Sequence, residues 1–341
     1  MVRSAKSIEK TREFKKVLSK LKKDSEVVEC IWKDENECEG KIITAHSIQN
    51  NRFLNKISEN GDIYYFSPQI TKDDELVSEF EKKGRKTFST FRGFCQKHDK
   101  ELFQAIEDHK YVGSDEQKFL FAFRAFAKEY HSKKQGIISY ENLINMIINT
   151  SGEIESKNKR LFLCYQMLEY EKITVDILKR ELEFFKKEIK KKTFQGIYTK
   201  EIILSKEYPI VCNSLLLPYL NSEFEECFLE EETEKIQNGD LNPGIYLNIF
   251  PEDGKTYVLI SCLEKYKELL KKFYSPLEKK ENILNQISNI ILMYAENTGF
   301  SPKYIKEFFV EQEIEKINEI FMENLRDPYF SLKKSINLFR E

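Results

Sequence analysis

The spacing of apolar residues changes along the chain and divides it into segments. Between residues 4 and 23, apolar side chains recur at helical spacing among lysines, which predicts an amphipathic helix with a basic outer face. This helix is interpreted as a docking helix with a solvated face, or alternatively as a contact to nucleic acid. Between residues 27 and 66, short β-type runs and glycine-containing turns predict short strands. The charged stretch from Gln69 to Lys86 predicts a surface connection or a loose helix.

Helical spacing returns in the middle of the chain. Between Glu116 and Lys133, aromatic and aliphatic residues form one stripe, which predicts a core helix that begins near Asp115. The pattern continues over residues 141–148, and residues 153–195 contain neither proline nor glycine. Residues 153–195 therefore predict a long helix or a helical hairpin of their own.

Residues 197–262 change character again, because short β-type runs are bounded there by prolines and by the turn Asp253-Gly254. From Leu263 onward the helical pattern returns. Together the segments predict an α+β fold with two parts. A small N-terminal module, residues 1–110, precedes a mainly helical domain, residues 111–341, into which a small antiparallel sheet is inserted near residues 197–262.

Composition narrows the classes of function. The 341 residues include 55 Lys and Arg against 57 Asp and Glu, so the net charge of −2 creates no global field toward nucleic acid or an anionic membrane. Any contact with nucleic acid must come from a local patch, and the first 29 residues offer one with nine basic and five acidic side chains. No apolar run reaches the roughly 18 to 20 residues of a membrane span, which predicts a cytoplasmic protein without a membrane partner.

The cysteines and histidines suggest one metal site. Cys95 and His98 stand three positions apart, a spacing at which a tight turn directs both side chains at one ion. Cys30 and Cys38 lie upstream with a wider separation and complete a set of four. Thiolate ligands favour zinc, and four ligands make a site structural. The alternative is that these are ordinary buried thiols.

The other cysteines and histidines lack such partners in the sequence. Seven cysteines are an odd number in a long chain, which argues against a disulfide framework. The four cysteines outside the predicted site are interpreted as structural. His109 and His131 stand beside charged neighbours and are predicted to lie on the surface.

Two short motifs carry a resemblance to a known family. Residues 41–51 read Lys-Ile-Ile-Thr-Ala-His-Ser-Ile-Gln-Asn-Asn, and residues 93–99 read Gly-Phe-Cys-Gln-Lys-His-Asp. With the Cys30 and Cys38 pair upstream, this order resembles the HNH (His-Me finger) nucleases of the treble-clef type. The resemblance covers about residues 29–108 and implies a zinc knuckle that frames a ββα unit, which cuts phosphodiester bonds.

The resemblance also implies roles for individual residues. His46 matches the general base that takes a proton from water, a task that suits a neutral imidazole. The alternative is a histidine that merely caps a strand end. Asp99 matches the position that helps to hold a catalytic divalent ion, Mg²⁺ or Mn²⁺. The family's asparagine before the knuckle is missing, and Asn50 or Asn51 is the candidate substitute.

Two functions are therefore weighed. The first is a metal-dependent nuclease acting on DNA or RNA, with Arg92, Lys97 and Lys100 near the knuckle as phosphate contacts or simply as solvated surface. A composition rich in Lys, Ile, Asn and Phe suggests a bacterial origin, and a nuclease module joined to a helical part resembles phage-defence proteins in layout. The second is a non-catalytic, zinc-stabilised interaction or nucleic-acid-binding protein. In either case the C-terminal helical part is a candidate surface for a protein partner or a homo-oligomer.

Overall fold

The computed structural model describes residues 16–17, 19–33, 38–70, 76–150, 154–279, 281–326 and 335–341. The helix predicted for residues 4–23 lies largely outside these ranges, and residues 19–24 are helical. The loop between Cys30 and Cys38 is described only up to residue 33.

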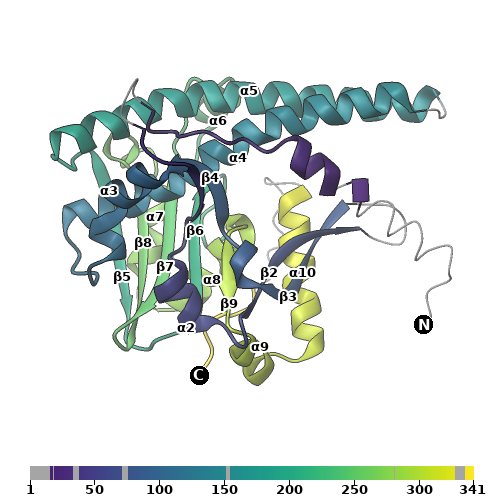
Figure 1. Ribbon diagram of the computed structural model, residues 1–341. Helices are drawn as coiled ribbons and strands as arrows, with labels where there is room; N and C mark the ends of the chain where they lie inside the picture. The colour runs from purple at the N-terminus through teal and green to yellow at the C-terminus, as the bar shows by residue number, and fades with distance from the viewer. Residues whose placement is uncertain are drawn as a thin grey trace.

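The centre of the molecule is a seven-stranded antiparallel sheet (Figure 1). In spatial order its strands are β3 (Leu76–Gly84), β2 (Asp62–Ile70), β9 (Thr298–Phe300), β6 (Ile210–Leu216), β7 (Ile245–Glu252), β8 (Lys255–Leu263) and β5 (Ile197–Leu204). A separate two-stranded sheet pairs β1 (Ile42–His46) with β4 (Thr90–Cys95).

Helices surround these sheets. The α-helices are α2 (Asn55–Ile57), α3 (Gln96–Glu107), α4 (Asp115–Asn149), α5 (Ile154–Lys191), α6 (Glu230–Gln237), α7 (Lys271–Tyr274), α8 (Ile283–Tyr294), α9 (Pro302–Phe308) and α10 (Glu311–Arg326). A π-helical turn, η1, spans Asn50–Leu54, and single 3₁₀ turns span Arg85–Thr87, Glu264–Tyr266 and Pro276–Glu278.

The sheet is larger than the sequence predicts. The strands expected near residues 197–262 are present, but they continue through β9 to β2 and β3, so strands on both sides of residue 110 share one sheet. The stretch from Gln69 to Lys86 contains the edge strand β3 where a connection or loose helix was predicted. Charged side chains are common on exposed edge strands, and this obscured its pattern.

The short strand β9 joins the two parts of the sheet. Phe300 stands opposite Tyr64 of β2 on one side and Ile210 of β6 on the other. Gly299 lies inside this strand, and a Cβ there would stand 3.0 Å from the ring of Phe88. The glycine lets an aromatic ring from outside the sheet pack directly on the β9 backbone, and a larger residue would have to displace that ring.

Alternating side chains bury both faces of the sheet. Val258 and Ile260 of β8 belong to the core shared with α8 and α10, whereas Leu259 belongs to the core shared with α4. The sheet thus lies between two helical layers and is apolar on both sides.

Of the two alternatives predicted for residues 153–195, the long helix is confirmed, because Ile154–Lys191 form the single helix α5, which packs against α4. These helices run side by side along one edge of the molecule and extend beyond the sheet (Figure 1). α4 begins after Ser114, whose hydroxyl accepts a hydrogen bond from the Gln117 backbone at 3.2 Å. Among the described residues, no helix is both long enough and apolar enough to cross a membrane, and this includes α4 and α5.

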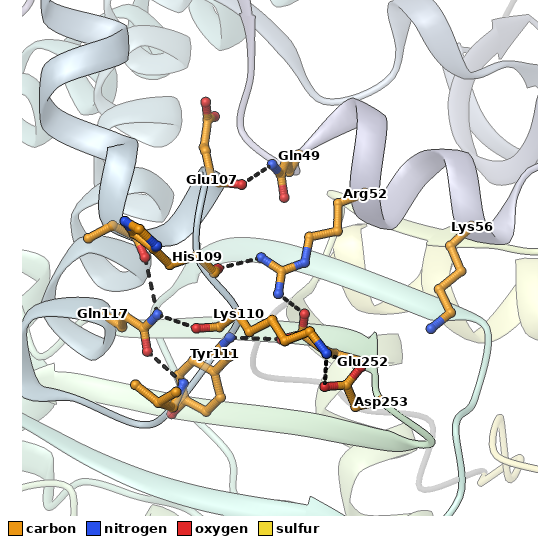
Figure 2. Close-up of polar contacts among 12 residues, drawn as sticks. Gln49, Arg52, Lys56, Glu107, His109, Lys110, Tyr111, Gln117, Glu252 and Asp253 are labelled. Carbon is orange, nitrogen blue, oxygen red and sulfur yellow. Dashed lines mark hydrogen bonds and ion pairs between the residues drawn. The ribbon is translucent and has the colours of Figure 1, made fainter.

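Residues 108–114 link α3 to α4 and are fastened to the sheet (Figure 2). Arg52 of η1 donates to the backbone carbonyl of His109 at 2.6 Å and pairs with Glu252 at the end of β7. Glu252 also accepts a hydrogen bond from the Tyr111 backbone at 2.9 Å, and Lys110 pairs with Asp253 at 2.8 Å. Polar contacts therefore cross the region where the sequence predicts a domain boundary.

Candidate metal centre and adjoining polar site

Three cysteine sulfur atoms and one imidazole nitrogen form a compact cluster. The Nδ1 atom of His98 lies 3.3 Å from the sulfur of Cys30, 3.7 Å from that of Cys38 and 3.2 Å from that of Cys95. All four candidate ligand atoms lie within 4.8 Å of one another. The four side chains could therefore hold one metal ion.

Both geometry and chemistry fit zinc. In a tetrahedral zinc site with Zn–S near 2.3 Å and Zn–N near 2.05 Å, neighbouring ligand atoms are about 3.5 to 3.8 Å apart. The sulfur–nitrogen distances of 3.2 to 3.7 Å in the structure are close to this range. Three thiolates and an imidazole suit zinc, whereas Mg²⁺ and Ca²⁺ prefer oxygen.

Local structure brings the ligands together. Cys95 is the last residue of β4, and His98 lies in the first turn of α3, so a strand-to-helix turn places both on one side. The segment that carries Cys30 runs along β4, where the Ile31 backbone donates to the Gly93 carbonyl at 2.8 Å. After Cys38 the chain turns at Gly40, whose φ of 76° lies in the left-handed region that glycine tolerates.

Burial shapes the protonation of the cysteines. Burial raises the pKa of the Cys30 thiol to about 12. Burial acts in the same direction on Cys95, but hydrogen bonds from the backbones of His98 and Glu39 outweigh it, so the pKa of Cys95 is lowered. A buried thiolate at Cys30 therefore needs a nearby cation, which a metal ion held by these four residues would supply.

Among the described residues, no other group of three or more such side chains is close enough to hold a metal. The four remaining cysteines, Cys164, Cys212, Cys227 and Cys262, are buried. Of the two histidines predicted for the surface, His109 is exposed but His131 is buried. The prediction is wrong for His131, because its Nε2 atom donates to the Val27 carbonyl at 2.9 Å and this bond offsets the cost of burial.

His46 ends β1, and its tautomer is fixed by a backbone carbonyl. The Nδ1 atom lies 3.1 Å from the carbonyl oxygen of Phe88. A carbonyl only accepts, so Nδ1 carries the proton and Nε2 is the basic nitrogen of the neutral ring. Burial lowers the pKa of His46, the Phe88 bond raises it, and two arginines, Arg124 and Arg85, lower it further. The net lowering keeps the ring neutral at pH 7.

Asp99 lies in the first turn of α3 and faces a buried arginine. Its Oδ1 atom is 3.9 Å from Arg124, which is 3% exposed, and Arg124 also contacts Glu107 at 2.5 Å. The guanidinium lies over the ring of Phe103, 4.5 Å from its centroid. Burial raises the pKa of Asp99 and Arg124 opposes this, with a net rise.

Arg124 and Glu107 were missed by sequence reasoning. The available signal was a single charge at Arg124 inside an otherwise apolar stripe of α4, because a charge on a core face requires a buried partner. The partner, Glu107, lies at the end of another helix and could not be identified from spacing.

Several buried polar atoms of residues 49–50, α3 and α4 lack hydrogen-bond partners within the described part of the chain. They are the acceptor oxygens Gln49 Oε1, Asn50 Oδ1 and Asp99 Oδ1 and the donor Arg124 Nε. Gln49 is held near Glu107, because its Nε2 atom donates to the Glu107 carbonyl at 2.7 Å. Asn50 begins η1, and its amide contacts Asn51 at 3.4 Å. Unsatisfied buried polar atoms are uncommon and often mark sites that take a ligand or water.

The three predicted phosphate contacts have different surroundings. Arg92 pairs with Glu26 at 3.2 Å, and Lys97 pairs with Glu39 at 3.0 Å. Lys100 is exposed on α3. Their role toward phosphate stays a prediction.

Comparison of the chain with known protein families, curated proteins and solved structures gives no match.

Proposed function

We propose that this protein is a metal-dependent nuclease that hydrolyses phosphodiester bonds in DNA or RNA, with zinc as a structural ion. The observation that carries the proposal is His46 at the end of β1, because the Phe88 carbonyl directs its basic Nε2 atom away from the backbone. The strand paired with β1 leads directly into the helix that carries the metal ligand His98. This order supports the resemblance to HNH nucleases of the treble-clef type.

The chemistry assigned to His46 is general base catalysis. Its Nε2 atom would take a proton from the attacking water, which a neutral ring with a lowered pKa can do at neutral pH. Arg85 and Arg124 act electrostatically on this ring, so positive charge stands close to where a phosphate would bind.

Asp99 and Asn50 are the candidate residues for a catalytic Mg²⁺ or Mn²⁺. Each offers a buried oxygen without a hydrogen-bond partner in the described structure, and oxygen is the ligand that these ions prefer. A divalent ion would polarise the phosphate and stabilise the leaving oxygen. Arg92, Lys97 and Lys100 are proposed to contact the strand, and a role in bacterial defence against phage is proposed by analogy of layout alone.

A non-catalytic role is the second candidate. The observation that favours it is the ion pair of Asp99 with Arg124, because an aspartate engaged by an arginine is less available to a metal ion. In this case the zinc site would be a structural clip, and the surface around it would bind a protein or nucleic acid without cleaving it.

Cleavage assays separate the two candidates. The purified chain is incubated with plasmid DNA or RNA and with Mg²⁺ or Mn²⁺, and His46→Ala is compared with His109→Ala, an exposed histidine outside the site. We expect cleavage by the parent chain and by His109→Ala, and a loss of at least about 100-fold in rate for His46→Ala with an unchanged melting temperature. Equal cleavage by His46→Ala would remove the proposal, and no cleavage by any chain would favour the non-catalytic role.

A further inference from the structure

A cleft of about 980 Å³ lies beside the metal unit, which comprises residues 26–33 and 38–40, β1, β4 and α3. It is lined by residues of the helical segment 19–24, β4, α4, α5 and β6, and by the residues that follow α8. His46 is not among the lining residues, although Thr90, its partner in the β1–β4 pairing, is one of them. The cleft therefore lies close to the proposed catalytic residue His46 but does not include it.

Two residues that line the cleft carry a buried acceptor oxygen without a hydrogen-bond donor in the described structure: Glu171 with Oε2 and Asn213 with Oδ1. The residues are 7% and 3% exposed. The other carboxylate oxygen of Glu171 accepts a hydrogen bond from Lys133 at 3.3 Å. A buried acceptor without a donor costs free energy, so a ligand in the cleft gains by supplying N–H or O–H groups here.

The orientation of the Asn213 amide follows from its neighbours. Asn248 donates through Nδ2 to the Phe121 carbonyl at 3.3 Å, which leaves its Oδ1 atom as an acceptor. Asn213 donates to that oxygen through Nδ2 at 2.6 Å. The Phe121 carbonyl can only accept, so it fixes the orientation of the Asn248 amide, which in turn fixes that of Asn213. The oxygen of Asn213 is then the atom that remains without a partner.

The surroundings of Glu171 are acidic. Burial raises the pKa of the Glu171 carboxyl and Lys133 lowers it, while Glu129 and Glu296 raise it further. These carboxylates do not form a group compact enough to hold a metal ion, since the Cys₃His cluster alone meets that condition among the described residues. Lys133 lies 3.7 Å from Glu129 and 3.3 Å from Glu171. A ligand with N–H donors fits this region better than a bare metal ion.

Two other features of the lining point to an anionic and aromatic ligand. Five lysine and arginine side chains contribute to it: Lys22 and Lys23, both exposed, Arg92 of β4, and Lys128 and Lys133 of α4. The rings of Tyr65 and Phe88 also line it and pack with their centroids 4.8 Å apart. Basic groups bind phosphate, and aromatic rings stack on nucleobases.

We propose that the cleft binds a nucleotide, with an amino group of its base toward Glu171 and Asn213 and its phosphate toward Lys22, Lys23 and Arg92. Adenine, cytosine and guanine carry such an amino group, whereas uracil and thymine do not. The nucleotide is either a free mononucleotide or one unit of a single strand. The site goes beyond the proposed nuclease activity, because it binds whether or not the chain cleaves.

The first test is a binding titration with the full chain carrying His46→Ala, which removes the proposed base and preserves the cleft. AMP and CMP are expected to bind at least about tenfold more tightly than UMP, because only they supply the amino donor. Glu171→Gln is expected to weaken AMP binding about tenfold, while Glu169→Gln, an exposed change on the same helix, leaves it unchanged. Equal affinity for AMP and UMP, or no effect of Glu171→Gln, overturns the proposal.

The second test uses the exposed basic group, where substitution does not threaten the fold. Lys23→Glu is expected to weaken AMP binding about tenfold and to leave adenosine binding unchanged, since adenosine lacks the phosphate. A five-residue oligoadenylate distinguishes the two sources: tighter binding than AMP identifies a strand, and equal or weaker binding identifies a free nucleotide. Failure to bind either probe overturns the proposal, whereas failure of cleavage alone leaves nucleotide binding intact.

Discussion

The metal unit and the sheet body, meaning the seven-stranded sheet with the helices on its two faces, are stabilised in different ways. In the metal unit, four side chains from three separate segments meet at one point. In the sheet body, apolar side chains from many elements bury both faces of the sheet. A point-like site is lost as a whole when one ligand is removed, whereas a distributed core loses stability in steps.

The largest effect should come from removing a zinc ligand. Cys95→Ser replaces a thiolate by a hydroxyl that binds zinc poorly, so bound zinc should be lost and the free energy of unfolding should fall by more than about 4 kcal/mol. Elemental analysis and chemical denaturation measure the two changes.

The matched control is Cys212→Ser in β6 of the sheet body. Cys212 is also buried, at 2% exposed, but the polar neighbours of its sulfur are the side chains of Thr298 and Ser214, the latter at 3.7 Å, and no candidate metal ligand. We expect a loss of about 1 to 2 kcal/mol with the zinc content unchanged. If Cys95→Ser retains its zinc, the claim that the metal site is lost when one ligand is removed is wrong.

The next effect uses pH to separate the two regions. Glu181 of α5 is 6% exposed and accepts hydrogen bonds from Asn242 at 2.9 Å and Tyr246 at 3.3 Å. Burial raises its pKa to about 7, so the folded state holds a proton that the unfolded state has released. The stability of the sheet body should therefore fall as pH rises from about 4.5 to about 7. The stability that zinc binding contributes should instead rise with pH, because acid protonates the cysteine and histidine ligands.

In the parent chain, the free energy of unfolding should be about 2 kcal/mol lower at pH 8 than at pH 5, as measured by urea denaturation. Glu181→Gln should remove this difference, because its amide does not titrate. Glu183→Gln is the control, because Glu183 lies on the same helix with a side chain that is 70% exposed. A parent chain whose stability is equal at pH 5 and pH 8, in zinc-saturated buffer, would contradict the assignment of a buried proton to Glu181.

The smallest effect on folding should come from His46, which belongs to the metal unit but is not a ligand. Because its pKa is lowered in the folded state, the unfolded state binds a proton first as pH falls below about 6.5, and stability should decline. His46→Ala should reduce this acid sensitivity by less than about 1 kcal/mol.

Any cleavage should persist from pH 8 down to the lowered pKa of His46 and decline below it. A rate that already falls between pH 8 and pH 7 would contradict this.

Local signals in the sequence were informative where the chemistry is specific. Cysteine and histidine have few roles, so their spacing identified a cluster at Cys30, Cys38, Cys95 and His98 that could bind zinc. The long helices α4 and α5 were also predictable, because an apolar stripe and the absence of proline constrain a long segment strongly.

Long-range pairing was not predictable in the same way. β9 is only three residues long and contains Gly299, so it carries no periodic signal. The pairing of Arg124 with Glu107 joins two helices and depends on how they pack. In both cases the deciding partners are remote in the sequence, and nothing near either partner specifies the other.

The position of β9 has a consequence for synthesis on the ribosome. Among the strands that the structure describes, β9 alone joins β2 to β6, and it is made more than 200 residues after β2. At roughly 5 to 20 residues per second, the open edge of β2 would wait on the order of ten seconds or more for its neighbour. An unpaired edge invites other chains, so the nascent protein has a long interval in which a chaperone that shields this edge would raise the yield.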